Sequence, residues 1–133
     1  MFKLNMLTID GKKYNGEVSR ISLPTSDGIR TILANHMDIV VPIEIGKIRL
    51  IRDNSTEEVA VSEGIFKFSD NIAHLFVRTY EFADEIDPER AQRAKERAEK
   101  KLEDKQTSRD MLEAELALKR AITRISTSKY SQK

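Results

Sequence analysis

The sequence predicts a mainly β chain that ends in α-helices, with a break in composition between the two parts. All five glycines and seven of the eight aromatic residues lie before residue 84. From residue 84 onward, 24 of 50 residues are charged, against 21 of the first 83. We therefore predict two domains, residues 1–84 and residues 85–133.

The first part has the pattern of an all-β domain. Short runs rich in Val, Ile and Phe alternate with turn signals such as Asp10-Gly11 and Ser26-Asp27-Gly28. The expected strands cover residues 2–9, 17–23, 29–33, 43–52, 59–61, 65–68 and 72–80. Turns at this close spacing favour a sandwich or a barrel over a parallel sheet with crossover helices.

The second part has the pattern of two helices. Asp87 can cap a helix whose first residue is Pro88, and Glu89 adds a negative charge to its first turn. Small and apolar residues follow at helical spacing, at Ala91, Ala94, Ala98 and Leu102. Residues 104–108 break the pattern, with Thr107 or Ser108 as a second cap. The second stripe consists of Met111, Ala114, Leu118, Ala121, Ile122 and Ile125.

This helical hairpin has few large apolar residues to bury. Each one contributes roughly 1.5–3 kcal/mol when fully covered, whereas ordering the backbone costs about 1–2 kcal/mol per residue. We therefore expect the hairpin to need the β domain or another protein to hold it. Such an element can exchange between arrangements when a ligand or a partner favours one of them.

Composition excludes several classes of function. The formal net charge of +1 argues against a dedicated nucleic-acid binder. No cysteine is present, and neither histidine, His36 or His74, lies in a catalytic or metal-binding pattern. Neither a P-loop nor a Gly-x-Gly-x-x-Gly run occurs. We expect no catalytic residue, no metal site, no membrane insertion, and a soluble protein of the cytosol.

Four arginines are spaced for an anion site. Arg90 and Arg97 share one face of the first predicted helix, and Arg120 and Arg124 share one face of the second. If the helices fold back antiparallel, the four guanidinium groups converge near the start of the first helix, where unpaired N–H groups favour anions. A solvated, salt-bridged helix surface explains the same spacing, and spacing alone identifies no nucleotide.

Several segments, in order and at the right spacing, resemble the epsilon subunit of bacterial F-type ATP synthases. Residues 32–39, Ile-Leu-Ala-Asn-His-Met-Asp-Ile, are similar to the family's Ile-Leu-Pro-Gly-His-Ala-Pro-Leu. Residues 46–50 and 64–68 match later landmarks of the family. Residues 83–87, Ala-Asp-Glu-Ile-Asp, and 117–121, Ala-Leu-Lys-Arg-Ala, match the joining segment and the second helix. The replacement of the family's Pro-Gly by Ala-Asn, and of its next proline by Asp38, changes the expected loop conformation.

The resemblance implies a flattened sandwich of two five-stranded sheets followed by an antiparallel two-helix hairpin. It also implies a non-catalytic subunit of the central rotor, peripheral to the cytoplasmic face of the bacterial cell membrane. Its implied partners are the gamma subunit and the membrane ring of c subunits. The hairpin would extend toward the catalytic beta and alpha subunits to inhibit ATP hydrolysis, with Lys119, Arg120 and Arg124 meeting acidic surface there.

Some epsilon subunits bind ATP through an Ile-Asp-x-x-Arg-Ala motif, and residues 86–91 are similar to it. The resemblance then implies a site made by Glu81, Ile86, Asp87, Arg90, Ala91, Arg97, Arg120 and Arg124. Arginines would neutralise phosphates and the carboxylates would orient the base or ribose, with ATP as a regulatory ligand and no obligatory cofactor. A motif that only starts a helix is the alternative.

Two other functional classes fit the same residues. One is a free-standing ATP sensor whose hairpin closes on the nucleotide, and the other is a scaffold whose hairpin binds another helix. Co-purification with gamma distinguishes a rotor subunit from both.

Overall fold

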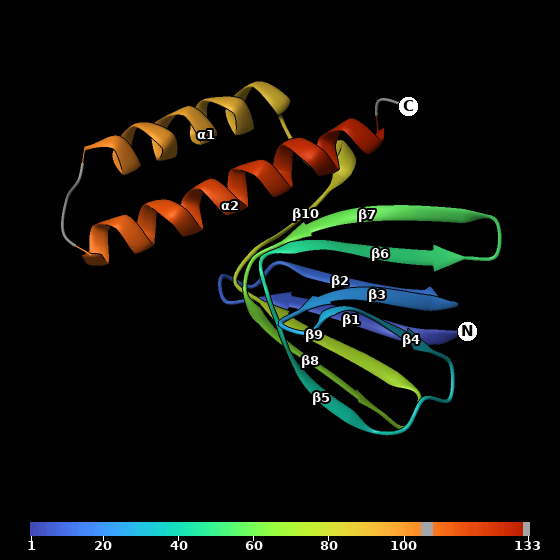
Figure 1. Cartoon of the computed structure of the whole chain (residues 1–133). Coiled ribbons are helices and arrows are strands. Elements are labelled where there is room, and N and C mark those ends of the chain that lie inside the picture. The colour runs from blue at the N-terminus through green and yellow to red at the C-terminus, as the bar shows by residue number, and fades with distance from the viewer. Residues whose placement is uncertain (105–107, 132–133) are drawn as a thin grey trace.

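The structure, a computed structural model, describes residues 1–104 and 108–131. Ten strands form a sandwich, and a short 3-10 helix leads from it into two helices (Figure 1). The strands are β1 (Phe2–Thr8), β2 (Lys13–Val18), β3 (Arg20–Thr25), β4 (Gly28–Leu33), β5 (Ile39–Ile43), β6 (Gly46–Arg52), β7 (Ser55–Val61), β8 (Gly64–Ser69), β9 (Ile72–Val77) and β10 (Tyr80–Phe82). The helices are η1 (Ala83–Glu85), α1 (Pro88–Glu103) and α2 (Ser108–Ser131).

The strands form two five-stranded sheets. One has the order β2-β1-β9-β8-β5 and the other β10-β7-β6-β3-β4. All pairs are antiparallel except β1 with β9, which run parallel. Alternate residues of the strands point inward and form one apolar core. Its largest fully buried side chains are Phe66, Phe68, Leu4, Met6, Ile21, Leu23, Ile32, Ile48, Leu50 and Leu75. The predicted sandwich and hairpin are confirmed.

The strand boundaries differ from the prediction in four places, one of which is the start of β7 at Ser55 rather than at residue 59. The segment predicted as 17–23 is divided between β2 and β3 at Ser19, and all of β5 except Ile43 lies before the segment predicted as 43–52, which corresponds to β6. Both missed strands, β2 and β5, lie at a sheet edge. The sequence of β2, Lys-Tyr-Asn-Gly-Glu-Val, has little apolar character, whereas β5 is apolar but contains Pro42, which argues against a strand. The segment predicted as 72–80 is divided at Arg78-Thr79, because the chain passes there from one sheet to the other.

The loop that departs from the family's Pro-Gly turns at Asn35. This residue has a φ of 63°, in the left-handed region that glycine favours. Its backbone N–H donates to Oδ1 of Asn71 at 2.8 Å. Asparagine tolerates this conformation better than most side chains do, so the turn forms without glycine.

The two helices pack through small residues. Asp87 caps α1 as predicted, with Oδ1 accepting from the backbone N–H groups of Glu89 at 3.0 Å and Arg90 at 3.3 Å. The buried apolar positions along the described parts of the two helices are alanines, namely Ala91, Ala98, Ala114 and Ala121, and Thr127 and Ser128 are buried near the end of α2. Larger apolar residues of the predicted second stripe, Met111 and Ile122, remain exposed. The second predicted cap at Thr107 lies outside the described residues, and α2 begins at Ser108.

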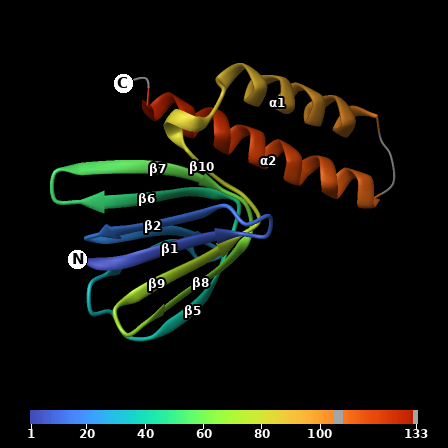
Figure 2. The same cartoon turned by 180° about the vertical axis from the view of Figure 1, so that it is seen from behind.

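The hairpin lies against one end of the sandwich rather than over a whole sheet. Figures 1 and 2 show α2 crossing β10 and the adjoining ends of β6 and β7, while the end of α1 and the start of α2 project past the sandwich. A small apolar cluster of Ala60, Ile86 and Ala91, with Ile125 packed on it, makes this contact. It is separate from the main core, so the hairpin adds little to the burial that folds the sandwich.

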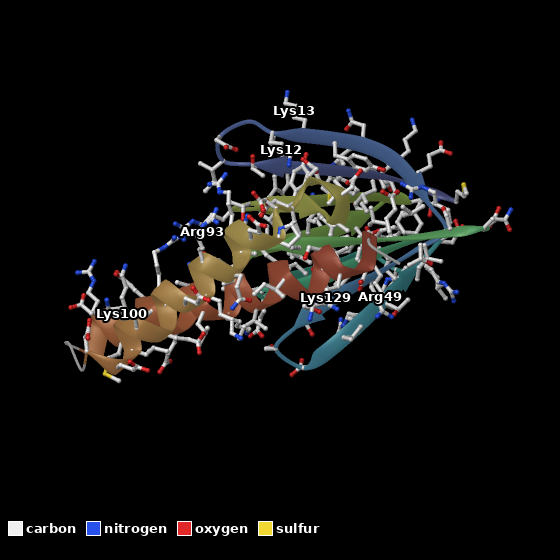
Figure 3. All side chains as sticks on the ribbon, turned by 90° about the horizontal axis from the view of Figure 1, so that it is seen from above. Lys12, Lys13, Arg49, Arg93, Lys100 and Lys129 are labelled. Atoms are coloured by element: carbon white, nitrogen blue, oxygen red, sulfur yellow. The ribbon has the colours of Figure 1, made fainter. Side chains whose placement is uncertain are left out.

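A polar contact lies under the last turns of α2. Lys47 on β6 donates from Nζ to Oγ of Ser126 at 2.8 Å. Glu58 on β7 is only 3% exposed, and its Oε2 lies 3.2 Å from Nε of Arg49 and 3.6 Å from Nζ of Lys47. Viewed from above, Arg49 lies on the sandwich beside this end of α2 (Figure 3). The buried carboxylate therefore holds the lysine that binds the helix.

Because the main core contains no hairpin residue from the ranges 88–104 and 108–131, a chain that ends at Asp87 should still fold. We expect a dispersed β-sheet NMR spectrum and a cooperative thermal transition from residues 1–87. A spectrum without dispersion would show that the hairpin is part of the folding unit.

Candidate functional site

A pocket of about 470 Å³ lies between the hairpin and the end of the sandwich. Four elements line it: the β1–β2 turn, the segment at β10, and one face of each helix. The lining residues are Thr8, Asp10, Lys12, Thr79, Tyr80, Glu81, Ala94, Ala117, Arg120, Ala121 and Arg124. Two of its cations, Arg120 and Arg124, come from α2. The sandwich supplies the third cation, Lys12, and the carboxylates of Asp10 and Glu81.

Arg124 and Glu81 form the shortest ion pair across this pocket. Arg124 donates from Nε to Oε1 of Glu81 at 2.7 Å and from Nη2 to Oε2 at 3.3 Å. Both side chains are only about a quarter to a third exposed. The two-point geometry suits a guanidinium and a carboxylate, and it fixes α2 to β10.

Arg120, one helical turn earlier, is less well satisfied. Its Nη2 lies 3.6 Å from Oε1 of Glu63, which is an ion pair without a hydrogen bond. Its Nε is buried and has no hydrogen-bond partner in the described part of the chain. Glu63 also accepts from Nη1 of Arg78 at 3.4 Å. Partial burial opposes ionisation of Glu63, but its own backbone N–H, Arg120 and Arg78 outweigh it and hold the pKa below its ordinary value.

Lys12 connects the β1–β2 turn to the segment that enters α1. Its Nζ donates to the carbonyl of Tyr80 at 3.0 Å and to Oε2 of Glu85 at 3.0 Å, and it lies 4.3 Å from the centre of the Tyr80 ring. Figure 3 shows Lys12 pointing from the turn toward this segment. Oε1 of Glu85 accepts from the backbone N–H of Phe82 at 3.1 Å. The turn therefore fixes the position of η1 and of Glu81 just before it.

Comparison with known proteins identifies the family. A model of the ATP synthase delta/epsilon chain β-sandwich domain matches residues 1–83, and one of the delta/epsilon chain long α-helix domain matches residues 84–129. The ATP synthase epsilon chain of Bacillus licheniformis is 39% identical over 127 residues, which cover 96% of this chain and 97% of the relative. The chain belongs to the ATP synthase epsilon-chain family.

Other relatives agree with this assignment. The epsilon chain of Lactobacillus gasseri is 38% identical over 94% of this chain and 90% of its own. A chain in the Euglena gracilis mitochondrial ATP synthase structure of the OSCP/F1/c-ring has the same fold, with a TM-score of 0.75 at 19% identity over 98% of this chain and 80% of that one. An epsilon chain is a stalk subunit of ATP synthase and not a catalytic one. This supports a subunit of the synthase over a free-standing sensor or scaffold.

Three of the eight predicted site residues of this epsilon chain line the pocket: Glu81, Arg120 and Arg124. Arg90 and Arg97 are exposed on α1. They lie four residues before and three after Ala94, which lines the pocket, so all three share one helix face. Of the four arginines predicted to converge, the two on α2 therefore line the pocket, and the two on α1 lie beside it.

The other motif residues have structural roles. Ile86 and Ala91 are buried against Ala60, where a larger side chain at position 91 would separate α1 from β7. Asp87 caps α1 through its carboxylate. These contacts set the angle at which α1 leaves the sandwich. Any role of Asp87 toward a nucleotide would have to share the carboxylate oxygens with the cap.

Sequence reasoning missed Lys12 and Asp10, which line the pocket, and Glu63, which lies outside the lining but pairs with Arg120. The Asp10-Gly11 turn was predicted, but nothing in its sequence indicates that it lies beside two helices far along the chain, α1 and α2. The pKa of Asp10 is held below its ordinary value, chiefly by a hydrogen bond from the Thr8 hydroxyl. Only a predicted strand order would have placed these residues.

Two further findings concern the described residues, 1–104 and 108–131. No group of three or more His, Asp or Glu side chains among them is arranged to hold a metal ion. No helix among them has the length and apolar character needed to cross a bilayer.

The cap at Asp87 can be separated from a charge requirement by two substitutions. Asp87→Ala removes the acceptor for two N–H groups and should lower the free energy of unfolding by about 1 kcal/mol, whereas Asp87→Asn keeps an acceptor and most of the stability. Chemical denaturation followed by circular dichroism measures both. Equal losses from the two variants would mean that the charge, and not the cap, is what matters for stability.

The contact of Lys12 with Glu85 should depend on pH. Partial burial opposes ionisation of Glu85, but Lys12 and the Phe82 N–H outweigh it and hold the pKa below its ordinary value of 4.5. A lowered pKa adds stability above about pH 4.5 and loses it as the pH falls through the folded-state value. The stability difference between wild type and Glu85→Gln, measured by denaturation, should therefore shrink from pH 7 toward pH 3. A gap that stays constant would contradict this.

Proposed function

We propose that this chain is a rotor subunit of the central stalk of a proton-translocating F-type ATP synthase. It would dock on the gamma subunit and on the ring of c subunits at the cytoplasmic face of the bacterial cell membrane. There it would help couple proton flow to ATP synthesis. Family membership and the identity to bacterial epsilon chains support this role.

An exposed apolar surface on the first sheet supports docking on gamma. Leu7, Phe76, Ile65 and Pro42 are neighbours across β1, β9, β8 and β5 in one cross-strand row. Phe76 is 45% exposed, and Ile9, just beyond β1, is 89% exposed. The row borders a depression of about 560 Å³. Contiguous apolar surface of this kind marks interaction sites, so we assign gamma to this face.

The hairpin would respond to ATP, and the observation that carries this proposal is the pocket where Arg120 and Arg124 face Glu81. Arg120 and Arg124 would neutralise phosphates, helped by Arg90 or Arg97 from the adjoining face of α1. Glu81, and Asp87 at the start of α1, would orient the base or ribose. We expect binding without hydrolysis at this site.

Binding would stabilise the folded hairpin by RT ln(1 + [ATP]/Kd), because the pocket exists only when α2 lies on the sandwich. When ATP is scarce, the hairpin would leave the sandwich and extend along gamma toward the catalytic beta and alpha subunits. Lys119, Arg120 and Arg124 would then meet acidic surface and restrain ATP hydrolysis. ATP would thus release the inhibition by holding the hairpin folded.

The two α2 arginines provide the test. Arg120→Ala combined with Arg124→Ala should weaken binding of ATP to the isolated full-length chain at least about tenfold, because each removes a charge-assisted contact. Calorimetric titration measures this, and a distance reporter between β7 and α2 follows hairpin closure in the same samples.

Arg109→Ala is the matched control. Arg109 is on the same helix but at its far end, where its Nε lies 3.6 Å from Glu113, and it does not line the pocket. It should leave the affinity unchanged. Equal binding by the double variant and wild type would reject the site.

A further inference from the structure

Arg120 has an incomplete set of contacts in the pocket. Its Nε is buried without a partner in the described residues, and its nearest carboxylate, that of Glu63, is 3.6 Å from Nη2. A buried unsatisfied donor costs free energy, and a charged one costs more. Arg124, by contrast, has two hydrogen bonds to Glu81. Arg120 is therefore the cation that gains most when an anion enters the pocket.

Glu63 lies outside the pocket lining and outside every motif residue considered above. It follows β7 in the turn to β8, and its Oε1 is shared between Nη1 of Arg78 at 3.4 Å and Nη2 of Arg120 at 3.6 Å. It therefore supplies Arg120 with a negative charge from the side, without making a hydrogen bond to it. An entering phosphate has to take over this position on the guanidinium and is repelled by the carboxylate next to it.

We propose that Glu63 is a built-in competitor of the phosphate anion for Arg120, and that it sets the affinity of the pocket. This inference rests on the proposed nucleotide function of the same site. Removal of the negative charge at position 63 tightens anion binding, although it deletes a contact between α2 and the sandwich. A residue that merely held the hairpin down would have the opposite effect, because opening of the hairpin lowers affinity.

Arg78 modulates this competition. Its guanidinium divides the charge of Glu63 and keeps the carboxylate from turning fully toward Arg120. Loss of Arg78 leaves Glu63 with Arg120 as its cation, so that the internal pair strengthens and the ligand binds more weakly. The two substitutions therefore act in opposite directions, although both break the same Glu63–Arg78 pair.

Glu44→Gln is a matched control. Glu44 lies between β5 and β6, and its Oε2 is 3.8 Å from Nζ of Lys119, the residue just before Arg120. This pair also joins α2 to the sandwich through half-exposed side chains. Neither residue lines the pocket, so loss of the pair removes a similar contact without releasing a pocket cation.

The experiment is calorimetric titration of the full-length chain with ATP and, separately, with inorganic tripolyphosphate. We expect Glu63→Gln to bind both probes about 3- to 10-fold more tightly than wild type, in line with the size of a partly exposed ion pair plus the relief of repulsion. Arg78→Met should bind both about 2- to 5-fold more weakly, and Glu44→Gln should bind no more tightly than wild type. Circular dichroism shows that each variant keeps its helices.

The outcomes separate the two proposals. If wild type binds ATP and Glu63→Gln binds it equally or more weakly, the competitor role is overturned and the nucleotide function stands. Tightening by Glu44→Gln to the same extent would also overturn it, since the effect would then be a general one of surface charge. Unchanged or tighter binding by Arg78→Met would contradict the shared carboxylate. A wild-type chain that binds neither probe overturns the nucleotide function and the competitor role with it.

Discussion

The pocket of this epsilon chain depends on a contact between two parts that fold by different means. Its arginines are carried by α2, and the carboxylates that pair with them, Glu81 and Glu63, are carried by the sandwich. Neither set makes a site alone. The pocket therefore exists only while the hairpin lies against the sandwich. Any ligand that binds both sides stabilises this arrangement.

The packing explains why this contact can be reversible. The sandwich has its own core between two sheets, and none of the described hairpin residues belongs to it. The hairpin instead meets the sandwich through Ala60, Ile86 and Ala91, with Ile125 alongside. Burial stabilises by about 25 cal/mol per Å² of apolar surface, and small side chains bury little of it. Ion pairs and the contact of Lys47 with Ser126 supply the rest, so separation exposes little apolar surface.

Much of the fold was open to prediction from the sequence. The Asp87-Pro88 helix start and the alanine spacing of both helices reflect local rules, and the structure has both of them. The edge strands β2 and β5 were not predicted as strands, β2 because its sequence is mostly polar and β5 because Pro42 interrupts its apolar run. Local signals of this kind depend on burial, and edges are the least buried part of a sheet.

The site was predicted less completely for a different reason. Arg120 and Arg124 could be paired because they are one helical turn apart, and Glu81 is close to the motif in sequence. Lys12 and Glu63 are brought to the same place only by the order of the strands, which no local pattern states. Asp87, by contrast, caps α1, as its sequence context predicted. Sequence spacing thus finds groups on one element and misses those that the sheet topology adds.

Magnitudes decide whether such a pocket can govern the hairpin. Each partly exposed ion pair between α2 and the sandwich contributes on the order of 0.2–1 kcal/mol. A ligand at a hundred times its Kd adds about 2.7 kcal/mol to the folded arrangement. That free energy exceeds the contribution of any one of these pairs. The ligand must also displace some of the existing contacts, since Arg124 and Arg120 already face carboxylates. The pairs therefore keep the pocket formed while it is empty and limit its affinity. A regulatory site needs both properties, because a ligand that bound too tightly would hold the hairpin folded at every concentration.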